Sequence, residues 1–289
     1  MYTDHKEYNV TQEEYFAMDG VSNSDISIFL ESPKRYALKK SGIWVQPKSK
    51  PMTLGSAFDI LLLTPDLFED GFAIMPDVPS PSTAMQEALV ACMKAGLSQA
   101  DAFAEAGYKR ADEKTWELLI PYVRFSQDAK GREVITQQEY ENLQAMVANT
   151  LQNPWSAATI RGAKKQRVFT AVHEATGLLV KGMLDLLDDE AVIDVKSTGE
   201  SVSRFPSKIF RNSYDRQLGH YCELARRDIA RLIAVEREGL NEVDCFELSE
   251  YTLQRGKEKM HEALLDLHVC QLNGFNGRPS TYKTGWVTV

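Results

Sequence analysis

The sequence predicts an α/β fold in which a small mixed sheet is flanked by helices and preceded by a helical N-terminal region. Segments with helix start and stop signals occupy most of residues 11–152. From residue 166 to 196 the apolar residues instead recur with a period near two, and β-branched residues appear. The 289 residues suffice for one large domain, 1–289, whose core needs no disulfide to fold.

Capping residues and proline mark the helices of the first half of the chain. Thr11 with Glu14 predicts a capping box that starts a first short helix, and Ser22 or Ser24 starts a second. Pro33 restarts a helix after that segment. Further helices are expected at residues 53–63, 85–110 with breaks at Gly96 and Gly107, 112–127, and 136–152, and a loop at 76–84.

Three consecutive strands are expected after residue 166, in the segments QRVFTAV, LLVKGMLDLL and AVIDVKS. The turn segments ATG and DDE separate them, so the strands should form an antiparallel meander. A long helix over 213–238, a strand in VDCFEL and an amphipathic helix over 251–272 complete the expected order.

Composition excludes several classes of protein. The net charge of −8 argues against a protein that coats nucleic acid by bulk electrostatics, but it leaves room for an acidic enzyme with one basic channel. The four cysteines lie far apart without a C-x-x-C pair, so neither a disulfide framework nor a cysteine metal site is expected. The same cysteine usage predicts a cytoplasmic location. No apolar run of about 18 residues predicts a membrane span, and the polar N-terminus predicts no secretory signal.

A D-x-K sequence lies on the last strand of the expected meander. Asp194 and Lys196 are two residues apart, so they share a face of the strand, while Val195 points to the other side. Asp185 lies on the preceding strand, and the turn at 188–190 should bring it alongside them. Two carboxylates and an ammonium group therefore converge on one spot.

This trio suits hydrolysis of a phosphodiester with a bound Mg²⁺, or with Mn²⁺. Mg²⁺ prefers oxygen ligands and keeps several waters, so two carboxylates and a backbone carbonyl can hold it. The alternative is a surface hairpin with a cross-strand salt bridge. The apolar strand around Asp194 favours the catalytic interpretation, because an unpaired charge there would be costly.

The hairpin resembles motifs II and III of the PD-(D/E)XK nuclease superfamily. More narrowly, the chain resembles the nuclease domain of the RecE (exonuclease VIII) family of phage and prophage exonucleases. Four segments carry this resemblance in the expected order: VSNSDISIFLESPKRYALKKSG, LGSAFDILLLTPDLF, GREVITQQEYENLQAM running into GLLVKGMLDLLDDEAVIDVKST, and YDRQLGHYCELA. The last is similar to the Gln-x-x-x-Tyr helix that follows the core sheet in RecB- and RecE-like nucleases.

The resemblance implies roles for individual residues. Asp185 and Asp194 would be metal ligands, Lys196 the catalytic lysine, and the carbonyl of Val195 a further ligand. Gln217 and Tyr221 are four residues apart, so on a helix they share a face that would look onto the active site and the DNA strand. Without the resemblance, the same pair fits a solvated helix face with a half-buried tyrosine.

Two positions depart from the family pattern. Asp59 stands where the family has a His in its Gly-x-x-x-His helix; it is either a ligand for a hard metal or a plain exposed position. Lys165 and Gln166 stand where the family often has a Glu before the first strand of the sheet. If that Glu is needed for metal binding, this protein would be weakened or inactive.

Several further residues are candidates for DNA contact. The segment RGAKKQR leads into the sheet and could grip phosphates, or be a solvated loop. Residues 85–110 faintly resemble a helix-turn-helix, and residues 80–110 are expected to be a helical insertion in the nuclease domain. The candidate contacts are Lys34, Arg35, Tyr36, Lys164, Lys165, Arg167, Ser197 and Thr198.

The family resemblance implies a Mg²⁺-dependent exonuclease that digests linear double-stranded DNA from its ends, 5′→3′, and leaves a 3′ single strand. It also implies a phage- or prophage-encoded protein of the bacterial cytoplasm, a homo-oligomeric ring, in particular a tetramer, and a RecT-like single-strand annealing partner. Two alternatives stay open: an endonuclease or nickase with the same core, and a catalytically weakened DNA-binding protein that kept the fold.

Overall fold

The computed structural model describes residues 1–76, 83–108, 117, 121, 124–125, 128–129 and 131–277. Most of the helix expected at 112–127, and residues 80–82 and 109–110 of the expected insertion, lie outside the described residues. The chain divides into two compact units. Met1–Ser49 with Met146–Val289 form the first unit, and Lys50–Ala145 form the second. The prediction of a single nuclease domain with an insertion at 80–110 stays a prediction.

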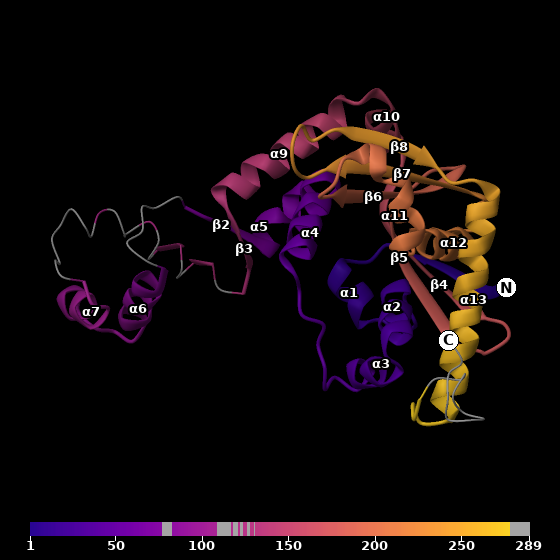
Figure 1. The fold of residues 1–289 in the computed structure, drawn as a ribbon, viewed down its shortest axis with the longest axis horizontal. Coiled ribbons are helices and arrows are strands. Elements are labelled where there is room, and N and C mark those ends of the chain that lie inside the picture. Colours follow the sequence, from indigo (N-terminus) through magenta and orange to yellow (C-terminus); the bar gives the residue numbers. More distant parts are fainter. Residues whose placement is uncertain are drawn as a thin grey trace. The chain divides into compact units, whose positions relative to one another are not determined.

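A six-stranded mixed sheet forms the centre of the first unit (Figure 1). Its order is β1-β4-β5-β6-β7-β8, and every neighbouring pair is antiparallel except β6 and β7, which are parallel. The strands are β1 (Tyr2–Tyr8), β4 (Lys164–His173), β5 (Leu179–Leu187), β6 (Ala191–Thr198), β7 (Ile229–Glu236) and β8 (Val243–Glu247). The predicted meander is confirmed as β4–β6, and the predicted strand in VDCFEL as β8, whereas β1 was not predicted.

The long helix predicted over 213–238 is wrong. The helix α12 (Tyr214–Ala225) ends at Arg226, whose backbone φ of 55° breaks the helix, and the chain then enters β7. The segment IARLIAVE of β7 is largely buried, and a short buried apolar strand cannot be distinguished from a buried helix by its periodicity. A parallel β6–β7 pair requires a crossover connection. The turn η2 (Val202–Arg204) and the helices α11 (Pro206–Arg211) and α12 supply it.

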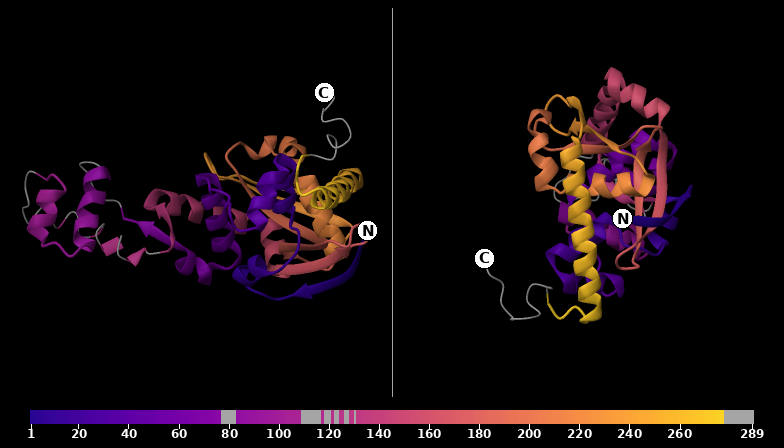
Figure 2. Two further views of the ribbon diagram at one scale, coloured as in Figure 1. Left: turned by 90° about the horizontal axis from the view of Figure 1, so that it is seen from below. Right: turned by 90° about the vertical axis from the view of Figure 1, so that its right-hand side faces the viewer.

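Helices cover the sheet of the first unit. Figure 2 shows α13 (Glu250–Leu272) as one long helix, and it packs along α12. Gly219 and Gly256 allow this close packing: a Cβ at Gly219 would lie 2.6 Å from the amide nitrogen of Lys257, and one at Gly256 would overlap the carbonyl of Asp215. Three N-terminal helices, α1 (Gln12–Ala17), α2 (Asn23–Glu31) and α3 (Pro33–Lys40), and the helix α10 (Pro154–Gly162) complete this unit.

The predicted helix starts are confirmed in detail. Thr11 and Glu14 form a capping box at α1, and Ser22 forms one with Asp25 at α2. These reciprocal hydrogen bonds satisfy amide groups that the first helical turn leaves without intrahelical partners. Pro33 stands in the first turn of α3.

The second unit has a two-stranded parallel sheet that the sequence did not predict. It pairs β2 (Phe72–Met75) with β3 (Glu133–Thr136). The predicted break at Gly96 is confirmed, because it separates α6 (Thr83–Lys94) from α7 (Gln99–Glu105). The other elements are α4 (Lys50–Leu63), η1 (Pro65–Leu67), α5 (Phe68–Gly71) and α9 (Gln137–Gln152), which continues into the first unit. No helix within the described residues combines the length and apolar character needed to cross a bilayer.

Candidate active site

The hairpin of β5 and β6 begins at a tight turn. The carboxylate of Asp188 accepts hydrogen bonds from the amides of Glu190 and Ala191 at 2.8 and 2.6 Å, which closes the turn. Two residue pairs follow in register, Leu187 with Val192 and Leu186 with Ile193. The next pair in the same register would be Asp185 with Asp194, and there the strand pairing stops.

A side chain takes over where the backbone pairing ends. The amide of Val195 donates a hydrogen bond to Oδ2 of Asp185 at 3.0 Å. Asp185 is half-buried, so this contact fixes one carboxylate oxygen where the two strands separate. The turn geometry and the register together place Asp185 beside the D-x-K sequence of β6.

Asp194 lies at the centre of a polar cluster although it is only 1% exposed. Its Oδ2 is 2.6 Å from Nζ of Lys196, and its Oδ1 accepts a hydrogen bond from Nε2 of Gln217 at 3.3 Å. A buried carboxylate is tolerated when a charge partner and hydrogen bonds compensate for lost solvation. The ammonium group of Lys196 also lies 5.4 Å from the ring centre of Tyr214.

The hydroxyl of Tyr221 lies next to this cluster and is influenced by its charges. Nε2 of Gln217 donates to this hydroxyl at 3.2 Å. Burial raises the pKa of Tyr221, and the negative charges of Asp194 and Asp185 raise it further, while Lys196 and Gln217 act in the opposite direction. Both carboxylates and the lysine are therefore close enough to act on a single hydroxyl. The structure thus brings together Asp185, Asp194, Lys196, Gln217 and Tyr221.

Two residues of this neighbourhood were not found from the sequence. Tyr214 faces Lys196 from the start of α12. Gly182 of β5 makes room for α12, because a Cβ there would lie 2.9 Å from Cε1 of Tyr221 and 2.8 Å from Cδ1 of Leu224. A glycine within a strand marks a close approach, and that signal was present in the segment KGMLD.

The donor chemistry of the cluster fits a hard divalent ion. Asp185 and Asp194 offer carboxylate oxygens at one place, and Mg²⁺ is held by one or two carboxylates while it keeps several waters. In the part of the chain that the structure describes, no group of three or more His, Cys, Asp or Glu side chains is placed to hold a metal. Within this cluster, Asp185 and Asp194 would hold the ion, and the carbonyl of Val195 stays a predicted ligand.

The predicted ligand Asp59 lies on α4 in the second unit, and it is half-buried. Its role in metal binding stays a prediction. Upstream of the β5–β6 hairpin, Lys165 and Gln166 are part of β4, and Gln166 has a positive φ of 50°.

Seven of the eight predicted DNA contacts fall into three groups by exposure and position. Lys34, Lys164 and Lys165 are exposed. Arg35 and Arg167 are half-buried and form ion pairs with Glu31 and Glu7. Ser197 is half-buried on β6, and Thr198 is 3% exposed.

Tyr36 corrects the expectation of a surface contact. It is 2% exposed and packs against Phe29 and Phe275. Its ring is therefore a core group, out of reach of a DNA strand while α3 is folded. The pattern Lys-Arg-Tyr looked like a basic and aromatic surface, but the helix turns its tyrosine inward.

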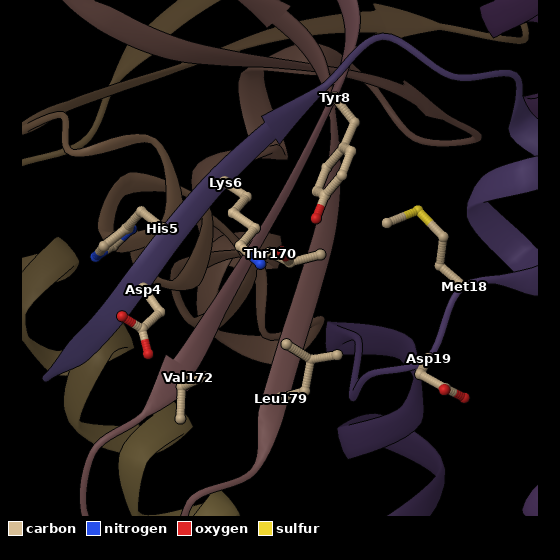
Figure 3. Close-up of a pocket in the computed structure, with 9 residues that line it drawn as sticks. All are labelled: Asp4, His5, Lys6, Tyr8, Met18, Asp19, Thr170, Val172 and Leu179. Carbon is tan, nitrogen blue, oxygen red and sulfur yellow. The ribbon is translucent and has the colours of Figure 1, made fainter.

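One pocket of about 590 Å³ lies elsewhere on the first unit, beside β1 and β4 (Figure 3). Figure 3 shows the side chains of Lys6 and Tyr8 pointing toward Thr170, while His5 points to the other side of β1. None of the five clustered residues lines this pocket.

The mixed sheet, the crossover helix and the D…D-x-K hairpin define the class of protein as PD-(D/E)XK-like. Residues 22–279 match the family described as "PDDEXK-like domain of unknown function (DUF3799)", and the chain belongs to this family. This finding and the fold confirm the predicted fold class.

Comparison with solved structures agrees at the level of fold. The crystal structure of a "Putative exonuclease" from Eubacterium rectale matches with a TM-score of 0.58 and 13% identity, covering 98% of this chain and 95% of that one. A structure described as SSO0001 covers 63% of this chain and 85% of its own, at 13% identity and a TM-score of 0.27, which does not indicate a shared fold. A search of curated proteins finds no match.

Proposed function

We propose that this protein is a metal-dependent deoxyribonuclease that hydrolyses phosphodiester bonds at Asp185, Asp194 and Lys196. The observation that carries the proposal is the set of contacts at the end of the β5–β6 ladder: Asp194 lies 2.6 Å from the ammonium group of Lys196, and Asp185 accepts from the amide of Val195 between them. A nuclease must hold a hard ion, orient a water molecule and stabilise negative charge on the phosphate. These side chains provide oxygen ligands and a cation within one cluster.

Each residue has a distinct task in the proposed reaction. Asp185 and Asp194 would hold Mg²⁺, which would supply polarisation of the scissile phosphate and a lowered pKa of bound water. Lys196 orients the attacking water or stabilises the developing negative charge. Because Asp194 and Tyr214 both contact its ammonium group, Lys196 is held in position before the substrate arrives.

Gln217 and Tyr221 position these groups from α12. Gln217 bridges the carboxylate of Asp194 and the hydroxyl of Tyr221 through the same amide nitrogen. This bridge ties the helix to β6, so the orientation of Asp194 depends on how α12 packs on the sheet.

The substrate and direction are a finer proposal that rests on the resemblance to RecE-like nucleases. In it the protein degrades linear double-stranded DNA from its ends, 5′→3′, and leaves 3′ single strands for phage-type recombination. The description of the structural neighbour from Eubacterium rectale as an exonuclease supports this choice. A tetrameric ring, a RecT-like annealing partner and a phage or prophage origin in the bacterial cytoplasm belong to the same proposal.

Incubation of linear and covalently closed circular plasmid with Mg²⁺ or Mn²⁺ tests the proposal. We expect loss of linear DNA only, no activity in EDTA, and none in Asp194→Asn or Lys196→Ala. Lys50→Ala is a matched control, because Lys50 also pairs with a carboxylate, at 2.7 Å from Glu139, but lies in the second unit. Cleavage of circular DNA would instead indicate an endonuclease or nickase. DNA binding without cleavage would indicate a weakened protein that kept the fold.

A further inference from the structure

One face of β6 continues beyond the proposed catalytic residues. Alternate residues of a strand share a face, so Thr198 follows Asp194 and Lys196 in one row. Thr198 is 3% exposed, and its hydroxyl accepts a hydrogen bond from Nζ of Lys208 at 2.6 Å. Lys208 belongs to α11, the helix that follows β6 in the crossover. A second lysine ammonium is thereby fixed at the end of the same row.

Lys208 is a buried lysine whose charge is compensated by an exposed partner. It is 8% exposed, and its Nζ lies 3.3 Å from Oε1 of Glu200. The side chain of Glu200 is 45% exposed. A buried charge requires a partner of opposite sign, but this partner can leave for solvent. Another anion that reaches the site can therefore take the place of the Glu200 carboxylate.

The same carboxylate oxygen also contacts an arginine. Nη2 of Arg211 lies 3.2 Å from Oε1 of Glu200, and the Arg211 side chain is 59% exposed. One oxygen atom thus sits between a lysine and an arginine. Arginine and lysine favour phosphate oxygens in this arrangement, and hydroxyl and amide donors commonly add to it.

The other charges near the 198–200 turn have both signs. Nη2 of Arg237 lies 3.0 Å from the position of a Cβ at Gly199, and Oε1 of Glu238 lies 3.9 Å from it. Thr198 holds the turn through Glu200, whose amide donates to the Thr198 hydroxyl and whose carbonyl accepts from it, both at 3.2 Å. Lys208 and Arg211 supply the positive charge at this turn, and both lose their carboxylate partner when the Glu200 side chain moves into solvent.

We propose that Lys208 and Arg211 bind an internal backbone phosphate of the DNA strand, next to the phosphate held at Lys196, that buried Thr198 positions Lys208 from β6, and that Glu200 occupies this site in the absence of DNA. The inference rests on the proposed nuclease function and adds the path of the substrate strand along β6. Two residues on a strand span about 6.6 Å. This spacing between Lys196 and Thr198 is comparable to that of successive phosphates in a nucleic-acid strand.

The test measures DNA affinity in the Asp194→Asn background, with a fluorescent linear duplex and Mg²⁺ at several salt concentrations. The exposed residues Arg211 and Glu200 are changed, since replacement of the buried Lys208 could unfold the protein. We expect Arg211→Gln to weaken binding roughly three- to ten-fold at low salt and to reduce the slope of log affinity against log salt by about 0.9. Glu200→Gln should tighten binding, because it removes the competing carboxylate.

Matched controls separate this site from a general charge effect. Arg226→Gln makes the same change at the exposed C-terminal end of α12, and Glu190→Gln makes it at the other end of β6. Both controls should keep the affinity and salt slope of the background protein. If Arg211→Gln and Glu200→Gln behave like their controls while the wild-type protein degrades linear DNA, the phosphate site is wrong and the nuclease proposal stands. If the wild-type protein neither binds nor degrades DNA, both proposals are wrong.

The bound phosphate could be internal to the strand or at its 5′ end, and duplexes with different 5′ ends distinguish the two. Duplexes with 5′-hydroxyl and 5′-phosphate ends should show the same loss of affinity in Arg211→Gln, because the proposed ligand is an internal phosphodiester. A loss confined to the 5′-phosphorylated duplex would overturn that assignment.

Discussion

The amide of Val195 and the carboxylate of Asp185 are joined by a 3.0 Å hydrogen bond at the point where β5 and β6 stop pairing. A strand amide that loses its ladder partner needs another acceptor, and Asp185 supplies it. The same hydrogen bond orients one carboxylate toward the space where Asp194 and Lys196 lie. The end of the ladder and the proposed catalytic centre are thus one structural feature.

Asp185→Asn should inactivate the enzyme without unfolding it. An asparagine oxygen can still accept from Val195, whereas the negative charge for a metal is lost. Metal-assisted stabilisation of charge is worth several kcal/mol, so activity on linear DNA should fall by about 100-fold or more. Asp189→Asn, in the exposed turn of the same hairpin, is the control and should keep full activity. An active Asp185→Asn protein with unchanged kinetics would remove Asp185 from the site.

Gly182→Ala should disturb both stability and activity. The new methyl group would press on Tyr221 and Leu224, which are parts of α12, and overpacking of this kind costs about 1–3 kcal/mol. Urea unfolding should show that loss, and cleavage should slow because Gln217 and Tyr221 move with the helix. Gly162→Ala is the control, since a Cβ there meets nothing within 4 Å. Equal stability of Gly182→Ala and the wild-type protein would contradict the tight packing of α12.

The sequence predicted those parts of the fold that depend on local pattern. The meander β4–β6 has alternating residues and clear turns, and the capping box at Thr11 involves residues three apart. β7 was missed because a buried parallel strand after α12 has no alternation that separates it from a helix. β1 was missed because its polar residues form an edge strand, which only pairing with distant β4 stabilises.

In the candidate site, too, local sequence pattern was predictable and tertiary packing was not. Asp185, Asp194 and Lys196 lie on one hairpin, so strand periodicity and turn position were enough to bring them together. Tyr214 depends on how α12 packs on the sheet, which is a tertiary relationship. Tyr36 was misplaced for the same reason, because the composition of a short helix does not reveal which of its faces becomes buried.

Binding of Mg²⁺ should stabilise the protein through Asp185 and Asp194. A ligand that binds only the folded state adds about 2.7 kcal/mol when its concentration is 100 times its Kd. Thermal unfolding with increasing Mg²⁺ should therefore show a rising Tm in the wild-type protein and a much smaller rise in Asp194→Asn. The Lys50→Ala protein should respond like the wild-type protein. An equal rise in all three would place the ion away from Asp194.

The free energy of unfolding should fall as the pH is lowered from 6.5 toward 4, because of the buried His220. Burial lowers the pKa of His220 to about 4, with the hydrogen bond to the carbonyl of Lys181 acting in the opposite direction. That carbonyl can only accept, so Nε2 carries the proton and Nδ1 accepts from the hydroxyl of Tyr2 at 2.8 Å. A second proton on Nδ1 would break this arrangement.

The sign of the effect follows from proton uptake. Below the ordinary histidine pKa of about 6.5, His220 binds a proton in the unfolded chain but stays neutral in the folded protein. The stabilisation present above pH 6.5 is therefore lost toward pH 4, by up to roughly 3 kcal/mol. Urea unfolding at pH 7.5, 6.0 and 5.0 should show this decline. His220→Gln should reduce the decline but not abolish it, because no group at that position titrates while His173, whose pKa burial also lowers to about 4, remains. His268→Gln, at a half-buried position of α13, should keep the full decline. An unchanged pH slope in His220→Gln would mean that other groups, such as the neighbouring His173, are responsible for the decline.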